Sequence, residues 1–449
     1  AGIRDWRHNA VRLRQADVVF LAYSSGTQAT IDGRKYNPLL APYVQLLEGT
    51  GRRAAVWEMC HEGEYNIPRS IASAYIQPPL LAFRLASLFT YRPDDTDARL
   101  EQFDRFVERA RSANLANRYT TVRALLRDAY FVRRTAAWFR RRLESVRPTH
   151  GFVADYGLRE LAFCLACREL GIPTVEIQHG VINETHPAYA SWQGVPERGY
   201  DTRPTTFWCW DATGVAAIEA WAAKTATGVR AVLGGDPWRE QWFKDDAPLV
   251  QTFDRRIEQL KEATGASLHV LVTLDPTGPV VPDVLLEAMR RAPRDWCFWV
   301  RLHPLGQRTR LPAARRALAA LPGVRCAPID LASEWPLHAL LRHVDVHVTG
   351  CWSTVVIEAE DFGVASVACA ERAREVFPDQ IASGTLRVAL TAEEIAAALA
   401  GQMRIRQPLP TRPRVDPARA MRDVLAAGAP PGQPLASPLA ATRSAAHHP

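Results

Sequence analysis

Apolar runs of strand length alternate with longer amphipathic segments along the chain, in two separate series. The first series opens with a β-rich run at residue 17 and ends near 236, and long arginine-rich helical segments lie between 98 and 147. The second series starts near residue 268 and ends near 400. Such alternation is typical of parallel sheets covered by helices. The pattern therefore predicts an α/β protein with two Rossmann-like, doubly wound domains.

The same pattern sets the predicted limits of the domains. Residues 1–236 are the predicted N-terminal domain, 237–265 the interdomain linker region and 266–403 the C-terminal domain. From 404 to 449 the chain is rich in Pro, Ala, Arg and Ser and lacks the periodicity of a packed element. We expect its last part to be disordered. In facing α/β domains, ligands bind at the carboxyl ends of the strands, so residues directly after strands are the candidates for a site.

The motif RLHP follows the predicted strand FWV of the C-terminal domain. Pro304 lacks an N–H and ends the strand, which leaves His303 at the sheet edge. The Arg301 guanidinium and the His303 imidazole can bind phosphate oxygens through charge-assisted hydrogen bonds. A His-Pro pair also ends strands in many α/β proteins without any ligand, and both readings are open.

The segment GCWSTVVIEAEDFG at 350–363 follows another strand of this domain. Ser353 and Thr354 come after a glycine turn, at the predicted start of a helix. Free N–H groups and the helix dipole favour an anion there, and the same hydroxyls can also simply cap the helix. Glu358, one turn further on, is a candidate for binding ribose hydroxyls.

Two elements of the N-terminal domain also follow predicted strands. Gln178-His179-Gly180 comes after VEI, and the glycine lets the chain turn sharply and approach a ligand closely. The loop beyond it is dense in titratable groups, including Glu184, which favours function over a plain linker. Asp155 follows GFVA and is a candidate acid or base, although it is also a good helix cap.

The formal net charge is +7, which suits an anionic partner. Between 131 and 147, six arginines are interleaved with aromatic residues against the single acid Glu144. This segment is either a solvated helix face or a surface for anions or for the anionic inner membrane. No apolar run approaches the roughly 18 residues of a membrane span. The eight cysteines are dispersed along the chain, which favours a reducing compartment. We therefore expect a cytoplasmic protein, which the arginine-rich segment would allow to contact the inner membrane peripherally.

Several catalytic motifs are absent from the sequence. It contains no G-x-x-x-x-G-K-[ST] and no G-x-G-x-x-G after a strand, which argues against P-loop and dinucleotide-binding enzymes. It contains no G-x-S-x-G elbow, which argues against an α/β-hydrolase. No D-x-D pair ends a strand, so we expect no metal and no separate cofactor. We also expect no nucleic-acid partner.

Taken together, IQHGVINETHPAY, RLHP and GCWSTVVIEAEDFG resemble bacterial surface-polysaccharide glycosyltransferases of the capsule and O-antigen kind. The QHG element resembles that of Kdo transferases, and His-Pro followed by Ser-Thr resembles bacterial sialyltransferases. The resemblance extends over about residues 17–400 and rests on short motifs. It implies a GT-B fold, a nucleotide-sugar donor as substrate in the C-terminal half, an acceptor in the N-terminal half and no metal.

The resemblance also implies roles for individual residues. His303 would contact the donor phosphate with help from Ser353 and Thr354, and His179 would face the donor sugar. Asp155 ranks first and Glu184 second as the base or nucleophile, although the acidic motif of sialyltransferases ends in Asp-Gly and here reads Asp-Tyr-Gly. A CMP-linked donor such as CMP-Kdo is favoured, with a growing surface polysaccharide or lipid-linked glycan as acceptor.

Two other functions are compatible with the sequence. A polyol-phosphate transferase of the teichoic-acid type also uses a GT-B scaffold with similar motifs, and would transfer a phospho-alditol from a CDP-alditol. A non-enzymatic polyanion-binding module could use the arginine-rich helix. The second reading leaves the histidines and hydroxyls at the strand ends without a role.

Overall fold

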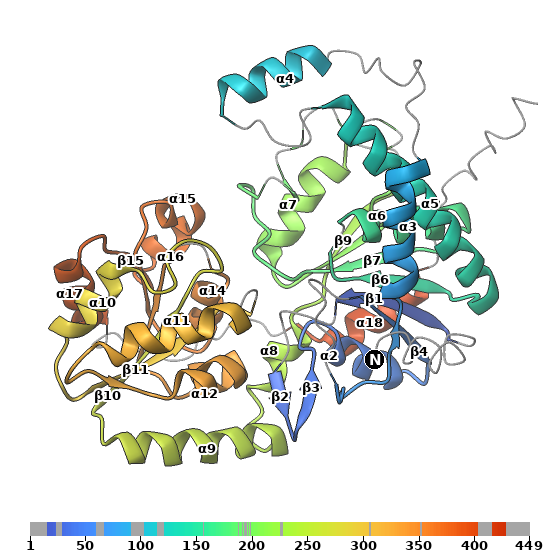
Figure 1. Ribbon diagram of the computed structural model, residues 1–449. Coiled ribbons are helices and arrows are strands. Elements are labelled where there is room, and N and C mark those ends of the chain that lie inside the picture. Colours follow the sequence, from blue (N-terminus) through green and yellow to red (C-terminus); the bar gives the residue numbers. More distant parts are fainter. Residues whose placement is uncertain are drawn as a thin grey trace, which may run out of the picture.

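The computed structural model describes residues 16–427 except for 24–28, 60–66, 91–102, 115–120, 156, 187, 191, 193–194, 196, 198, 225–227, 305–306, 351–352 and 403–414. These residues form two α/β lobes that stand side by side (Figure 1). The architecture of two doubly wound parallel sheets is the one that the sequence pattern predicts.

The first lobe is built on a seven-stranded parallel sheet with the order β5-β4-β1-β6-β7-β8-β9. Its central strands β6, β7 and β8 are buried along their whole length and β1 is buried up to Tyr23, because helices cover both faces. The strands are β1 (Val18–Tyr23), β4 (Ala54–Met59), β5 (Ala74–Tyr75), β6 (His150–Val153), β7 (Thr174–Ile177), β8 (Thr206–Cys209) and β9 (Arg230–Leu233).

Two apolar cores hold these helices on the sheet. Val19, Leu21 and Val153 face the core shared with α3 (Gln77–Thr90), α5 (Val122–Val146) and α6 (Leu158–Glu169). Phe20, Phe152 and their neighbours face the opposite core, which contains α2 (Ala41–Glu48). Helix α7 (Ala212–Ala222) packs beside β8, and α4 (Phe103–Ser112) connects α3 to α5.

The second lobe is built on a six-stranded parallel sheet with the order β12-β11-β10-β13-β14-β15. The strands are β10 (Leu268–Thr273), β11 (Trp296–Arg301), β12 (Arg325–Cys326), β13 (Val346–Thr349), β14 (Ser366–Ala368) and β15 (Leu386–Val388). The helices after β10 are α10 (Asp283–Arg291), α11 (Gln307–Ala319), α12 (Ile329–Glu334), α13 (Leu337–Leu341), α14 (Val355–Asp361), α15 (Ala373–Val376), α16 (Pro378–Ala382) and α17 (Ala392–Gln402).

The region between the two sheets contains α8 (Pro237–Gln241) and α9 (Pro248–Thr264). Val250, Phe253 and Ile257 of α9 are buried in the core of the second lobe. Arg239 of α8 forms an ion pair with Asp361 of α14 at 2.7 Å. The helices of this region are therefore fixed to the second lobe.

The hairpin of β2 (Ala29–Ile31) and β3 (Arg34–Tyr36) lies between the lobes (Figure 1). Tyr36 of β3 and Trp238 of α8 have ring centroids 4.8 Å apart. The hairpin thus joins the first lobe to the region around α8.

Helix α18 (Pro417–Ala426) lies within 404–449, where the sequence pattern does not predict a packed element. Met421 and Val424 are buried against the first sheet, in one core with Phe20 and Trp208. The chain therefore returns to the first lobe after completing the second. The signal was weak because the helix has only ten residues and lies beside segments rich in Pro and Ala. The predicted disordered tail lies outside the described residues.

Candidate functional site

The carboxyl ends of β1, β6 and β7 bring an acidic cluster together in the first lobe. It consists of Asp155, Glu160 and Glu176, with Tyr23 and His179 beside them. Because the three strands are neighbours and parallel, their ends lie at one edge of the sheet. The charge of Asp155 acts on the pKa of each of the other four groups. The sequence pointed to Asp155 and His179, and the structure places them in one cluster.

Glu160 lies in the first turn of α6 and is only 1% exposed. Burial, and after it the charge of Asp155, raises its pKa to about 7. The nearby Tyr23 side chain acts on this pKa in the opposite direction. Sequence reasoning missed Glu160, although its spacing from the buried Phe163 and Cys164 gave a signal for an acid on the inner face of the helix.

Glu176 lies within β7 and is buried. The hydroxyl of Tyr189 donates a short hydrogen bond to its Oε1. Burial raises the pKa of Glu176 well above its usual value, even though Tyr189 acts in the opposite direction. Sequence reasoning missed this residue too, and its signal was a carboxylate inside an otherwise apolar strand.

His179 follows β7, with its Nδ1 3.9 Å from Glu176 Oε1. Burial lowers its pKa, while the charge of Asp155 acts against that shift. The side chain remains 33% exposed. The imidazole is therefore favoured in its neutral form, which can accept a proton.

Gln178 and Gly180 hold the loop that follows β7. Gln178 Oε1 accepts a hydrogen bond of 2.6 Å from the N–H of Trp210, and its Nε2 donates one of 2.8 Å to the carbonyl of Gly180. Gln178 is buried at 2% exposure. Its amide thus ties the start of the loop to the residue after β8. Because Gln178 and Gly180 are both held, the backbone of His179 between these two residues is fixed as well.

The loop after β7 extends from the first lobe to the second. Val181 packs in one core with Val356 of α14 and Val376 of α15. Asn183 Nδ2 donates a hydrogen bond of 3.4 Å to the carbonyl of Val376. Glu184 follows and is exposed. The loop that begins at the acidic cluster therefore packs, within its first six residues, against the helix that follows Ser353 and Thr354.

Arg301 and His303 lie at the end of β11 in the second lobe. Nη1 of Arg301 donates to the carbonyls of Ala332 at 2.7 Å and Trp335 at 2.6 Å, and burial lowers its pKa to about 10. His303 is exposed, with its pKa lowered by the surrounding protein and then by the charge of Arg301. Pro304 follows outside the strand. Arg301 thus anchors the strand end that presents His303.

The start of α14 contains Ser353 and Thr354. The Oγ of Ser353 accepts a hydrogen bond of 3.3 Å from the N–H of Val355, so this hydroxyl caps the helix. Glu358, one turn further, is buried, with its Oε2 2.7 Å from Nε2 of His338. Burial acts to raise the pKa of Glu358, but the hydrogen bond and charge of His338 outweigh it and lower the pKa.

Asp275, just beyond β10, is a site candidate that sequence reasoning missed. A Cβ on Gly350 would lie well inside 3.0 Å of its Oδ2, so the carboxylate lies directly over the Gly350 backbone. Because β10 lies between β11 and β13, Asp275 lies between His303 and Ser353 along the sheet edge. At usual strand spacing the two outer positions are about 10 Å apart. The signal was an acid directly after the strand, in LDP.

Metal-binding clusters and membrane-spanning helices are both absent from the residues that the structure describes. No group of three or more His, Cys, Asp or Glu side chains in these ranges is arranged to hold a metal ion. No helix in the same ranges is long and apolar enough to cross a membrane.

The sequence matches no protein-family model and no curated protein. The structure is similar to that of UDP-GlcNAc 2-epimerase from Neisseria meningitidis bound to UDP-GlcNAc, with a TM-score of 0.52 and 11% identity over 91% of this chain and 98% of that one. S. aureus MnaA with UDP gives 0.51 and 11% over 91% and 95%. The UDP-GlcNAc 2-epimerase of Methanocaldococcus jannaschii gives 0.50 and 11% over 91% and 98%. At these identities the likeness concerns the fold, and the fold is GT-B, as the sequence predicts.

Proposed function

We propose that this protein is a glycosyltransferase that binds a nucleotide sugar between its lobes and transfers the sugar to a glycan or a lipid-linked glycan. The observation that carries the proposal is the loop after β7. It begins at His179, beside Asp155, and packs through Val181 against α14 of the second lobe. Residues 179–183 thus link the candidate acid and base groups to the helix that follows the candidate phosphate groups.

The donor diphosphate or monophosphate binds at the ends of β11 and β13 in this proposal. His303 and the hydroxyls of Ser353 and Thr354 supply hydrogen bonds to phosphate oxygens. Asp275 lies between His303 and Ser353. Because its carboxylate and the phosphate are both negative and repel each other, we propose that the carboxylate accepts hydrogen bonds from sugar or ribose hydroxyls of the nucleotide sugar instead. Arg301 holds His303 in place, and Gln178 holds His179 in place.

Asp155 takes the proton of the attacking acceptor hydroxyl. A positioned base of this kind contributes roughly 10²–10⁴ to the rate. Glu160 and Glu176, the neighbouring acids, have raised pKa values and so tend to keep their protons beside Asp155. His179, favoured as the neutral imidazole, steadies the donor sugar or leaving group.

The sequence resemblance and the similar solved structures favour different nucleotides in the donor. The sequence resemblance favours a CMP-linked sugar such as CMP-Kdo and an acceptor in surface-polysaccharide synthesis. The similar solved structures are named as complexes of UDP-GlcNAc and UDP. Both classes of donor therefore belong in the experiment.

Epimerisation of a nucleotide sugar is the second candidate function. The observation that favours it is the fold likeness to UDP-GlcNAc 2-epimerases over nearly the whole of their chains. The acidic cluster would suit it, because epimerisation needs one group to remove a proton and another to return it.

Product analysis separates the two reactions. The purified protein is incubated with CMP- and UDP-linked sugars, with and without a glycan acceptor, and the products are followed by NMR. Transfer releases the free nucleotide only when acceptor is present and lengthens the glycan. Epimerisation yields an isomeric sugar that is still attached to its nucleotide, without any acceptor. A protein that binds none of these donors would contradict the proposal.

A further inference from the structure

Helix α3 presents a continuous apolar face to solvent. Leu81, Leu85, Leu88 and Phe89 are 47%, 50%, 54% and 84% exposed. Their spacing places them on one side of the helix, while Leu80 on the other side is fully buried. These four are among nine large apolar side chains exposed in the described part of the chain, so exposure is concentrated on this helix. A patch of this kind is typical of a surface that meets another apolar phase.

Helix α5 lies beside α3 and borders this face with positive charge (Figure 1). Phe83 of α3 contacts Trp138 of α5, with ring centroids 6.2 Å apart. Arg134 and Arg142 lie one turn before and one turn after Trp138, on the same side of α5. The Arg142 guanidinium lies 5.5 Å from the centre of the Trp138 ring. Basic side chains therefore flank the seam between the two helices.

The charge around the face is one-sided. Helix α5 contains seven arginines and two acids, and one of these acids, Glu144, lies 3.8 Å from Arg140. Helix α3 contains Arg84 and no acid. An apolar helix face bordered by arginines is the arrangement with which interfacial helices bind anionic lipid. A solvated arginine face would not need the exposed leucines and phenylalanine of α3.

We propose that Leu81, Leu85, Leu88 and Phe89 insert into the interface of an anionic lipid membrane, where the arginines of α5 contact headgroup phosphates. Charge selects this partner over a second copy of the chain, because a symmetric dimer through this face would bring two arginine-rich helices together. The surface is separate from the strand ends and does not depend on the proposed reaction.

The apolar face of α3 that we propose to bind the membrane begins close to the acidic cluster. Gln77, the first residue of α3, accepts a hydrogen bond of 3.2 Å from Arg159, which precedes Glu160 in the chain. If the proposed transfer to a lipid-linked glycan holds, a membrane-bound acceptor would reach the cluster from the start of α3.

Vesicle flotation of the full chain tests the proposal. We expect the protein to float with phosphatidylglycerol-containing vesicles and not with pure phosphatidylcholine, and binding to fall as salt rises. The double variant Leu85→Ser/Phe89→Ser should bind at least about tenfold more weakly, because burial of a large apolar side chain contributes about 1.5–3 kcal/mol, which corresponds to about tenfold or more in affinity. The triple variant Arg134→Gln/Arg141→Gln/Arg142→Gln should also bind at least about tenfold more weakly, since one arginine near such a surface contributes about fivefold.

Matched variants on the second lobe serve as controls. Leu390→Ser removes an apolar side chain that is 45% exposed, and Arg255→Gln/Arg256→Gln removes two exposed arginines of α9. Both should bind vesicles like the wild type. Circular dichroism and thermal unfolding confirm that each variant is folded, and neither measurement depends on the proposed reaction.

Three outcomes would overturn the proposal. The first is no flotation, or equal flotation with neutral vesicles. The second is an equal loss of binding in the control variants. The third is a wild type that is dimeric by light scattering and becomes monomeric in Leu85→Ser/Phe89→Ser without vesicle binding, which would assign the face to a second copy.

Discussion

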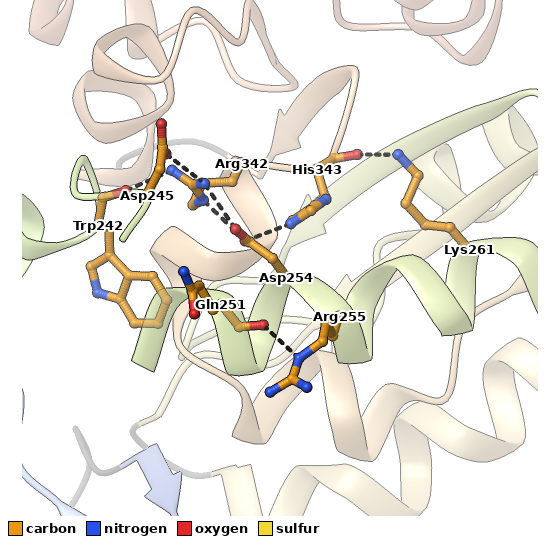
Figure 2. Close-up of polar contacts among 8 residues, drawn as sticks. All are labelled: Trp242, Asp245, Gln251, Asp254, Arg255, Lys261, Arg342 and His343. Atoms are coloured by element: carbon orange, nitrogen blue, oxygen red, sulfur yellow. Dashed lines mark hydrogen bonds and ion pairs between the residues drawn. The ribbon is translucent and has the colours of Figure 1, made fainter. Parts of the chain in front are cut away.

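Arg342 and Asp254 form a two-pronged ion pair between the end of α13 and the middle of α9. Nε of Arg342 lies 3.0 Å from Oδ1 of Asp254 and Nη2 lies 2.9 Å from Oδ2 (Figure 2). Nε2 of His343 lies 2.7 Å from the same Oδ1, and Lys261 donates to the His343 carbonyl at 2.8 Å. Helix α9 is therefore held to the second lobe by charge as well as by its apolar face.

Replacing Asp254 by Ala should destabilise the second lobe. Asp254 and Arg342 are only 21% and 19% exposed, and the variant leaves the guanidinium without its main partner. We expect the free energy of unfolding, measured in urea, to fall by about 2–3 kcal/mol. Asp245→Ala is the control, because Asp245 also contacts Arg342 but is 86% exposed, and it should cost less than about 1 kcal/mol. Equal losses in both variants would refute the buried pair.

The pH dependence of this pair has a definite sign. Burial would raise the pKa of Asp254, but the hydrogen bonds from Arg342 and His343 outweigh it and lower the pKa below 3.8. The stabilisation that the ion pair gives the folded protein is thus fully present above pH 3.8, and it is lost as the pH falls through the lowered pKa of Asp254. The difference between wild type and Asp254→Ala should therefore shrink in acid.

Glu160→Gln should stabilise the protein increasingly as the pH rises. The folded protein keeps the Glu160 proton up to about pH 7, whereas the ordinary value is 4.5. Between these values the folded state binds the extra proton, so raising the pH lowers the free energy of unfolding, by about 3 kcal/mol in all. Gln has nearly the same size as Glu and cannot titrate, so the variant escapes this loss.

Urea unfolding of wild type and Glu160→Gln at a series of pH values measures this difference. The buried His150, His269 and His347 have pKa values lowered to about 4, 4 and 3 by burial, and they titrate in both proteins. Their contribution cancels when the two curves are subtracted. A difference that does not change between about pH 5 and about pH 8 would show that Glu160 does not hold a raised pKa.

Gly350→Ala should weaken donor binding more than it affects stability. The new Cβ would displace the Asp275 carboxylate, which we place against donor hydroxyls. We expect nucleotide-sugar affinity to fall about tenfold, the usual worth of a hydrogen bond to a charged group. In Gly180→Ala, the added Cβ meets no heavy atom within 4 Å, so the affinity should not change through crowding. Unchanged affinity in Gly350→Ala would remove Asp275 from the donor site.

Much of the fold could be predicted from the sequence, because buried parallel strands are short apolar runs that end in Gly, Pro or a polar residue. Asp155 and His303 could be found for the same reason, since each follows such a run. Glu160 and Glu176 were missed because they lie inside a helix and a strand, where an acid in an apolar run shows burial but not what surrounds it. The nearness of Glu176 to Asp155 depends on β7 lying beside β6, and strand order is not readable from local pattern.

Asp155→Asn should abolish most of the proposed transfer. The amide cannot take the proton of the acceptor hydroxyl, so turnover with a matched donor should fall by roughly 10²–10⁴ while donor affinity persists. Glu184→Gln, on the exposed part of the loop after β7, should have a smaller effect. If Asp155→Asn retains near wild-type turnover, the carboxylate only serves the start of α6, and the base lies elsewhere.

The most direct test of the account is calorimetric titration of CMP- and UDP-linked sugars into the wild type and His303→Ala. We expect the wild type to bind at least one donor. The variant should bind it about tenfold to a hundredfold more weakly, which corresponds to a loss of roughly 1.5–3 kcal/mol for a charge-assisted hydrogen bond. Gln307→Ala, four residues further along the chain, should bind like the wild type. A wild type that binds no nucleotide sugar, or a folded His303→Ala that binds with unchanged affinity, would contradict the proposed donor site.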